Sequence, residues 1–113
     1  MSGSEVEKRP VWNEALARQL PGKVLLVGMT YFDGNGQFIE QQEFFGRVVS
    51  ANERNGILLN LEGRRAGEQY NLPPDMRSIF EASPGEYRLR STGEVVVDPD
   101  FTVTFSLRQQ PHA

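Results

Sequence analysis

The sequence contains no cysteine and only one histidine among its 113 residues. Without cysteine the chain has no disulfide bond, no thiolate nucleophile and no zinc–thiolate or iron–sulfur site. The histidine, His112, is next to the last residue and lies in a polar stretch that offers no scaffold for a metal cluster or a catalytic triad. The sequence therefore predicts no catalytic residue, no bound metal and no cofactor, and it indicates a protein that is not an enzyme.

Long hydrophobic runs and a strong net charge are also absent. The longest apolar run, at 24–27, is far too short to cross a bilayer. The N-terminal stretch MSGSEVEKRP has no apolar segment like that of a signal peptide, so we expect a cytoplasmic protein without membrane contact. The 12 basic and 15 acidic residues give a net charge of −3, which would not attract nucleic acid over a distance.

Periodicity in the rest of the sequence predicts strands and one helix. The helical spacing of Trp12 and Leu16, ended by a Pro-Gly pair, predicts a short helix over 11–20 that packs these side chains on a core. From Lys23 onward apolar residues alternate with polar ones, as is typical of strands. The expected strands cover 23–32, 37–50, 57–62, 69–72, 86–90, 95–97 and 101–108, and a helical turn within 76–84 is expected to point Met76, Ile79 and Phe80 inward.

The segment 37–50 is long for one straight strand, and its apolar residues change parity. Phe44 lies on one parity, whereas Phe45 and Val49 lie on the other. Glycine inside a strand often marks a bulge or a bend. We therefore expect this strand to bend at Gly46.

The DGNG motif at 33–36 matches both the centre of an EF-hand calcium loop and a tight hairpin turn. If Gly36 takes the glycine position of the calcium loop, the first ligand position falls on Tyr31 and the bidentate carboxylate position falls on Gln42. Neither side chain is the oxygen ligand that calcium needs at that position. Asp-Gly and Asn-Gly tolerate positive φ in turns that join antiparallel strands, so the motif predicts a hairpin.

Short strands, frequent turns and one bent strand predict a small antiparallel barrel or sandwich with one short N-terminal helix, and a half-open barrel of five or six strands is the expected form. We expect a single domain at 10–108, with flexible tails at 1–9 and 109–113.

Three segments between residues 11 and 63 resemble the Sm-like family of small RNA-binding barrels. They are the helix followed by LPGKVLLV (20–27), then FGRVVSAN (45–52), then NGILLNLEG (55–63). The resemblance implies an SH3/Sm-like barrel and a tendency to associate through strand edges. The whole chain is also similar to small, uncharacterised bacterial families of this barrel type.

The residues with which the Sm-like family binds RNA bases match only in part. The family uses an Asp and an Asn before the third strand, and an Arg-Gly pair later in the chain. Asn55 matches the Asn, but Ala51 stands at the Asp position, and Arg90 is followed by Ser91. The resemblance therefore carries over the barrel but not RNA binding.

Several arginines fall in the strand-and-loop region. If 86–90 is a strand, Arg88 and Arg90 share one face of it. Guanidinium groups beside tyrosine rings would bind an anion or a nucleic acid, whereas arginines balanced by nearby glutamates would only be solvated. The candidate binding patch comprises Arg47, Arg64, Arg65, Tyr70, Arg88 and Arg90.

These observations favour a protein-interaction or assembly module. An edge strand such as 101–107 would pair with a protein partner or with a second copy of the chain. One alternative is an Sm-like RNA-binding protein, whose affinity would fall steeply with salt. Another is a small-molecule binder at the barrel mouth, with Tyr31, Tyr70, Asp98 and Asp100 as the candidate residues. The two aspartates flank Pro99, however, as residues that form a turn do.

Overall fold

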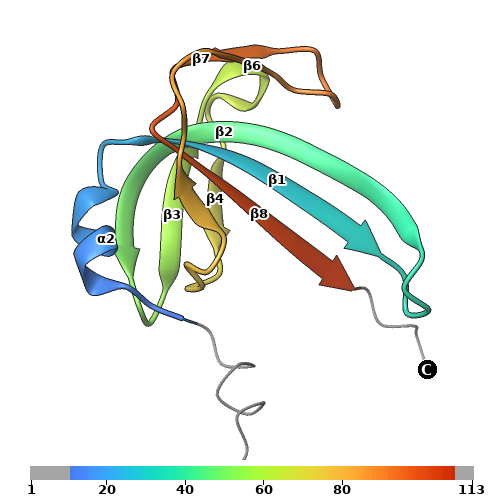
Figure 1. Ribbon diagram of the computed structural model, residues 1–113, viewed down its shortest axis with the longest axis horizontal. Coiled ribbons are helices and arrows are strands. Elements are labelled where there is room, and N and C mark those ends of the chain that lie inside the picture. Colours follow the sequence, from blue (N-terminus) through green and yellow to red (C-terminus); the bar gives the residue numbers. More distant parts are fainter. Residues whose placement is uncertain (1–10, 109–113) are drawn as a thin grey trace, which may run out of the picture.

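The computed structural model describes residues 11–108, which form a mainly β structure with one short N-terminal helix (Figure 1). The tails expected at 1–9 and 109–113, and His112 with them, lie outside the described residues. In chain order the elements are α2 (Glu14–Gln19), β1 (Val24–Phe32), β2 (Phe38–Asn52), β3 (Gly56–Leu61), the single 3₁₀ turn η1 (Gly63–Arg65), β4 (Gln69–Leu72), β5 (Ile79–Glu81), β6 (Glu86–Arg88), β7 (Val95–Val97) and β8 (Phe101–Arg108).

Six strands form one sheet in the order β4-β3-β2-β1-β8-β5, and β6 and β7 form a separate hairpin. Neighbours in the large sheet are antiparallel except β1 and β8, which run parallel. Within residues 11–108, β4 and β5 are the two edges of this sheet and do not pair with each other. The expected mainly β fold with one short N-terminal helix is therefore confirmed, but the expected half-open antiparallel barrel is wrong, because the sheet is mixed and does not form a barrel.

Two hydrogen bonds explain why β8 runs parallel to β1. The backbone N–H of Val24 donates to Oδ2 of Asp100 over 2.9 Å, and the backbone N–H of Asp100 donates to the Val24 carbonyl over 3.0 Å. These bonds hold the start of β8 beside the start of β1, and the parallel register continues as far as Phe32 opposite Arg108. A contact between distant residues leaves no periodic signal, so alternation in the sequence predicts the strands but not their directions.

Helix α2 is shorter than the expected 11–20 because its cap lies at Asn13. The side chain of Asn13 accepts a hydrogen bond from the Leu16 N–H over 3.0 Å, which satisfies one of the free donors of the first turn. The predicted packing is confirmed: Trp12 and Leu16 are partly buried against the core, and Ala17 is fully buried. In the part of the chain that the structure describes, no helix is long and apolar enough to cross a bilayer.

The core lies on one face of the large sheet, which we call the core face; the opposite side is the outer face. Along β1, Leu25, Val27 and Met29 point to the core face and are at most 1% exposed. Residues from β3, β4, β5, β8 and the segment before β5 complete this cluster, among them Ile57, Leu59, Leu72, Met76, Ile79 and Val103.

Strand β2 curves through the sheet, and its irregularity with β3 lies at Val49 rather than at Gly46. The register with β3 shifts between Val48 and Ser50, and Val49 is 45% exposed. Gly46 pairs regularly with β1, but a Cβ at this position would lie only 2.5 Å from the Asn60 carbonyl oxygen. The expected bend at Gly46 is therefore wrong, and glycine is needed there because β3 approaches closely.

The DGNG motif forms the turn between β1 and β2, so the predicted hairpin is confirmed. Oδ1 of Asp33 accepts hydrogen bonds from the backbone N–H groups of Asn35 and Gln37, over 2.8 and 2.9 Å. Gly36 has a φ of +86°, a conformation that favours glycine.

The helical turn expected within 76–84 is wrong, because this segment contains strand β5. Met76 and Ile79 are buried as predicted, whereas Phe80 is 63% exposed. Successive side chains of a strand point to opposite faces, so Ile79 and Phe80 cannot both face the core.

Candidate functional site

Three strands extend beyond the rest of the sheet and form a feature that we call the arm. It consists of residues 28–32 of β1, 38–43 of β2 and 104–108 of β8; the remainder is the body. Figure 1 shows these strands running away from α2, β3 and β4. The partners of the two outer strands stop at the body: β3 pairs with β2 only at 46–52, and β5 pairs with β8 only at 101–103. Within residues 11–108 the arm therefore has two open edges.

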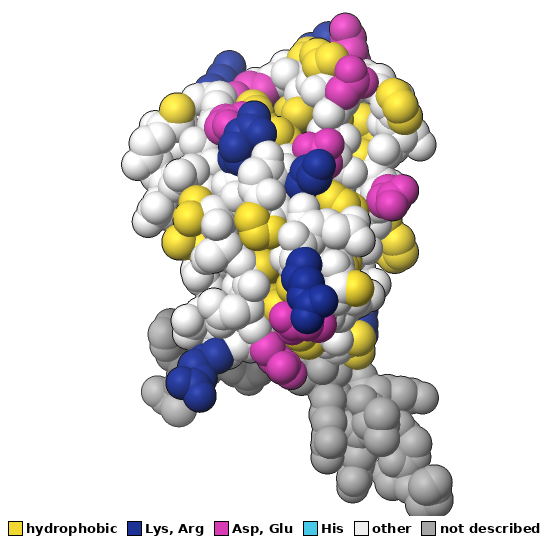
Figure 2. All heavy atoms as spheres, turned by 90° about the vertical axis from the view of Figure 1, so that its left-hand side faces the viewer, with side chains coloured by type: hydrophobic (Ala, Val, Ile, Leu, Met, Phe, Trp, Pro, Cys, Tyr) yellow, Lys and Arg dark blue, Asp and Glu magenta, His cyan; other side chains and the backbone are white. Residues whose placement is uncertain are grey.

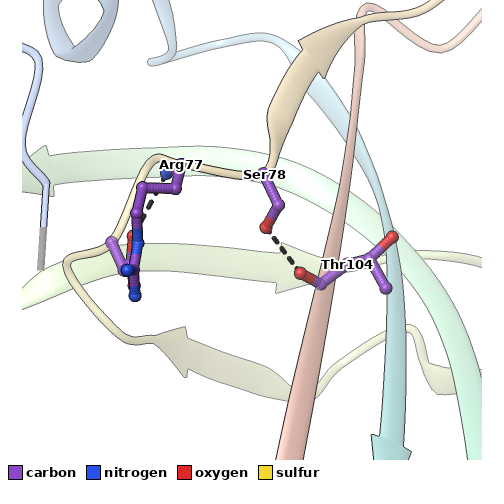
Figure 3. A network of polar contacts seen from close by, with 4 residues as sticks. Arg77, Ser78 and Thr104 are labelled. Carbon is purple, nitrogen blue, oxygen red and sulfur yellow. Dashed lines mark hydrogen bonds and ion pairs between the residues drawn. The ribbon is translucent and has the colours of Figure 1, made fainter. Parts of the chain in front are cut away.

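The open edge of β8 begins where Ser78 interrupts the pairing with β5. The register of Ile79 opposite Val103 would place Ser78 opposite Thr104. There the Ser78 hydroxyl donates a hydrogen bond of 2.6 Å to the Thr104 carbonyl (Figure 3). The Ser78 side chain thus occupies the Thr104 carbonyl, which would accept a backbone N–H of β5 if the pairing of β5 with β8 continued. Residues 105–108 follow with β1 on one side and no described strand on the other.

An ion pair fixes the turn that precedes β5. Nη2 of Arg77 lies 2.6 Å from Oδ2 of Asp75, and the backbone N–H of Arg77 donates to Oδ1 of the same carboxylate over 3.1 Å. These hydrogen bonds from Arg77 hold the pKa of the Asp75 carboxyl below its usual value. In Figure 3 only the Ser78 side chain points toward Thr104, while that of Arg77 is directed elsewhere. The turn therefore sets the point at which the ladder with β8 starts.

Side chains on the open edge of β8 alternate between the two faces of the sheet. Phe105 lies on the core face beside Met29 of β1 and is half-buried. Leu107 comes next on this face, beside Tyr31, and is 36% exposed. The outer face carries exposed polar side chains, namely Thr104, Ser106 and Arg108. The edge is thus apolar on one face and polar on the other.

The open edge of β2 differs, because the hairpin of β6 and β7 ends against it. The backbone N–H of Glu43 donates to the Ser91 hydroxyl over 3.3 Å, and the Glu43 carboxylate accepts hydrogen bonds from the backbone N–H groups of Arg90 and Ser91. Beyond this contact, Glu40 and Gln42 lie on the core face of the edge. The β2 edge is therefore polar on the face where the β8 edge is apolar.

The core face of the arm meets the body at a cluster of aromatic residues. Tyr70 of β4 donates a hydrogen bond of 3.3 Å to the sulfur of Met29, and its ring centroid lies 5.0 Å from that of Phe44. The guanidinium carbon of Arg65 lies 4.8 Å from the centroid of the Phe44 ring. Burial, together with the charge of Tyr70 and a hydrogen bond with it, raises the pKa of Tyr31. Two residues of the predicted patch, Arg65 and Tyr70, thus come together as part of this junction.

The other arginines of the predicted patch are engaged elsewhere. Nε of Arg47 lies 3.5 Å from the Glu62 carboxylate, and Nη1 of Arg88 donates to the Gly93 carbonyl over 3.3 Å. Strand β6 ends at Arg88, and Arg90 lies in the turn that follows. The expectation that Arg88 and Arg90 share a face of one strand is therefore wrong.

Acidic side chains accompany the basic ones on the surface. Arg64 is exposed in η1, where its backbone N–H donates to the Glu94 carboxylate over 2.7 Å. Arg65 pairs with Glu68 at 2.9 Å. On the face drawn in Figure 2, lysine and arginine side chains lie among aspartate and glutamate side chains. That face has no continuous basic surface.

The four residues considered for a small molecule fall at two separate places. The tyrosines lie at the junction of arm and body, whereas both aspartates make structural hydrogen bonds. Oδ1 of Asp98 accepts from the Gly85 N–H over 2.7 Å, and Asp100 holds Val24 as described. A pocket of about 430 Å³ beside the aspartates is also lined by Gln19, Lys23, Glu81 and Pro84. Among residues 11–108, no group of three or more His, Cys, Asp or Glu side chains is placed to hold a metal ion.

No protein-family model, curated protein or solved structure matches the chain. The resemblance to Sm-like barrels thus has no matching relative behind it, and the open mixed sheet is not the SH3/Sm-like barrel that it implied. The candidate site rests on the geometry of the β8 edge. The expectation of an edge strand at 101–107 is wrong for 101–103, which pair with β5, and sequence reasoning missed Ser78. The sequence did contain a hint that part of β8 would stay unpaired. The apolar segment within 76–84 is too short to pair with all of 101–108.

Proposed function

We propose that this protein is a non-enzymatic interaction module that binds an extended segment of a protein partner at the open edge of β8. The observation that carries the proposal is that β5 pairs with β8 only at 101–103, which leaves 105–108 without a described neighbour on the outer side. A strand added there would form backbone hydrogen bonds, each contributing about 0.5–1.5 kcal/mol net.

The two faces of the edge select the sequence of the partner. On the core face, apolar side chains of an added strand would lie beside Phe105 and Leu107 and would cover Leu107. On the outer face, polar side chains would lie beside Ser106 and Arg108. Favourable cross-strand pairs contribute about 0.2–1 kcal/mol each. The preferred partner is therefore a segment in which apolar and polar residues alternate.

The alternatives have less support. RNA binding is favoured only by the position of Arg65 beside the aromatic junction, and this arginine also pairs with Glu68. A small-molecule site at one barrel mouth is disfavoured because its candidate residues are divided between two places.

A nuclear magnetic resonance titration with an alternating Thr-Val pentapeptide tests the proposal. We expect amide shifts at 105–108 and none at β4, and we expect a backbone N-methylated form of the peptide to lose the effect. Ser106→Pro removes a donor from the edge and should abolish the shifts, whereas Ser106→Ala should keep them. Shifts that survive Ser106→Pro, or that appear only elsewhere, would refute strand addition at β8. Oligonucleotide binding that weakens steeply with salt would favour the RNA alternative instead.

A further inference from the structure

The backbone of β8 presents particular residues to its open side. The Thr104 carbonyl points outward, because it accepts the Ser78 hydroxyl hydrogen bond. Backbone groups of successive residues in a strand point to opposite sides, so the N–H and C=O groups of Ser106 and Arg108 also point outward. The middle residue of the edge, Ser106, therefore offers both a donor and an acceptor to a neighbouring strand.

This arrangement permits the edge to pair with itself. In an antiparallel ladder, two residues that both point toward each other exchange two hydrogen bonds. If Ser106 lies opposite Ser106 of a second copy, a two-fold axis passes between them. Thr104 of each chain then lies opposite Arg108 of the other. At these two end positions the Thr104 carbonyl already accepts the Ser78 hydroxyl hydrogen bond, so we expect the complete pair of interchain hydrogen bonds only between the two Ser106 residues.

The side chains match in the same register. On the core face, Phe105 of one copy lies opposite Leu107 of the other, and the two-fold axis repeats this apolar pair. On the outer face, Ser106 meets Ser106 and Arg108 meets Thr104, so no two like charges lie directly opposite each other. Leu107, which is 36% exposed in the single chain, would be covered. The alternation of apolar and polar residues that the β8 edge favours in a partner is therefore the alternation found in β8 itself.

The open edge of β2 is a worse partner for β8. It would place Glu40 and Gln42 on the core face beside Phe105 and Leu107, so apolar side chains would face a carboxylate and an amide. Contact between two different edges is also heterologous, and repeating it can extend into an open chain of subunits. The β8–β8 contact closes after two copies.

From these observations we infer that the partner at the β8 edge is a second copy of this chain, paired antiparallel about a two-fold axis at Ser106. The inference rests on the proposed function, because it names the occupant of the same edge. The dimer contains one continuous sheet that runs through both copies.

Disulfide trapping tests the register, because the chain contains no cysteine of its own. Directly opposed hydrogen-bonded residues have Cα atoms about 5.5 Å apart, within the range of a disulfide. Ser106→Cys should therefore cross-link into a dimer in a glutathione redox buffer. Thr104→Cys is the matched control on the same strand and face. Its two copies would be about 14 Å apart in this register, so we expect cross-linking at least about ten-fold slower.

A mixture of Thr104→Cys and Arg108→Cys proteins provides a positive control for the register. These positions oppose each other across the axis, so the mixed disulfide should form while neither protein cross-links efficiently with itself. Equal cross-linking of all single variants would refute the register. Light scattering on the unmodified protein should show a concentration-dependent dimer, and Ser106→Pro should make it monomeric.

The outcomes separate this inference from the function on which it rests. A protein that stays monomeric, and that still binds the alternating peptide at 105–108, refutes self-pairing but keeps strand addition. A monomer whose Ser106 and Arg108 amides exchange slowly with solvent also refutes self-pairing, and it indicates an intramolecular occupant such as residues 1–10. A monomer that neither binds the peptide nor protects these amides refutes both proposals.

Discussion

The body and the arm contain parts of the same strands, yet they differ in what covers them. Along β1, Leu25 and Val27 in the body and Met29 near the start of the arm are buried, whereas Tyr31 farther along the arm is only half-buried. Strand β8 changes in the same way, from buried Phe101 and Val103 to Leu107, which is 36% exposed. Apolar and polar residues keep alternating throughout, so alternation indicates which face a side chain takes but not whether that face is covered.

The difference has a structural cause. In the body, α2, β3 and β4 and the segment before β5 contribute side chains to the core cluster. Within the described residues, the arm is a three-stranded extension whose two outer strands pair with no further strand. Substitutions in an extension of this kind should therefore change the free energy of unfolding less than substitutions in the body. Four predictions test this contrast, in decreasing order of expected effect.

Truncating a leucine in each region should show the largest difference. Leu59 in β3 is completely buried, so Leu59→Ala should lower the free energy of unfolding by about 2–5 kcal/mol. Leu107 in the arm is 36% exposed, and Leu107→Ala should cost only about 0.5 kcal/mol in the single chain. Urea denaturation at low protein concentration measures both variants. Similar losses would mean that the arm is packed as firmly as the body.

A pair of glycines gives the next contrast. A Cβ at Gly46 would lie 2.5 Å from the Asn60 carbonyl oxygen, so Gly46→Ala must push β3 away from β2 and should cost about 1–3 kcal/mol. A Cβ at Gly28, where the arm begins, meets no atom within 4 Å. Gly28→Ala should therefore leave stability unchanged or raise it by up to about 1 kcal/mol. Thermal unfolding distinguishes the two, and a stable Gly46→Ala protein would contradict the close approach.

The sequence predicted local features of the fold but not the contacts between residues far apart in the chain. The hairpin at Asp33, the packing of Trp12 and Leu16, and the strand at 101–108 follow from local patterns, and all are confirmed. The parallel direction of β8 depends on Asp100 bonding to Val24, residues far apart in the chain. A local pattern carries no information about such a pair.

The candidate site was predictable to a smaller extent. Alternation in 101–107 identified the strand that carries the open edge, but only the register with β5 shows where pairing ends. Arg65 and Tyr70 lie together against Phe44, whereas Arg47, Arg88 and Arg90 have their partners elsewhere. Positions within one strand follow from spacing, whereas contacts between elements do not.

The ion pair before β5 should make a smaller, pH-dependent contribution to the stability of the body. Its hydrogen bonds hold the folded-state pKa of Asp75 below the unfolded value of about 3.9. The contribution is therefore fully present above the unfolded pKa and is lost as the pH falls through the lower folded pKa. Arg77→Gln should raise the Asp75 pKa toward its ordinary value and flatten this dependence.

Denaturation of both proteins between neutral and strongly acidic pH measures the effect of the ion pair. Arg54→Gln is the matched control, because Arg54 lies in the turn between β2 and β3, whereas the pKa of Asp75 is set by Arg77, burial and the backbone of Val11. An Arg77→Gln protein that follows the same pH profile as the original would show that the ion pair does not set the pKa of Asp75.

The smallest expected effect concerns the junction where the arm touches the body. Burial and, after it, Tyr70 raise the pKa of Tyr31, so the charged phenolate is disfavoured in the folded state. Stability should therefore fall as the pH rises above the unfolded value of about 10. Tyr70→Phe removes the second cause but leaves the burial, so it should lower the Tyr31 pKa only in part.

Tyr87→Phe is the matched control, because the Tyr87 hydroxyl donates to the Ser83 carbonyl and lies in the separate hairpin. Site-specific ¹³C resonances of the tyrosine rings report the titration, and a Tyr31 pKa that Tyr70→Phe leaves unchanged would mean that the arm is not held to the body by this pair.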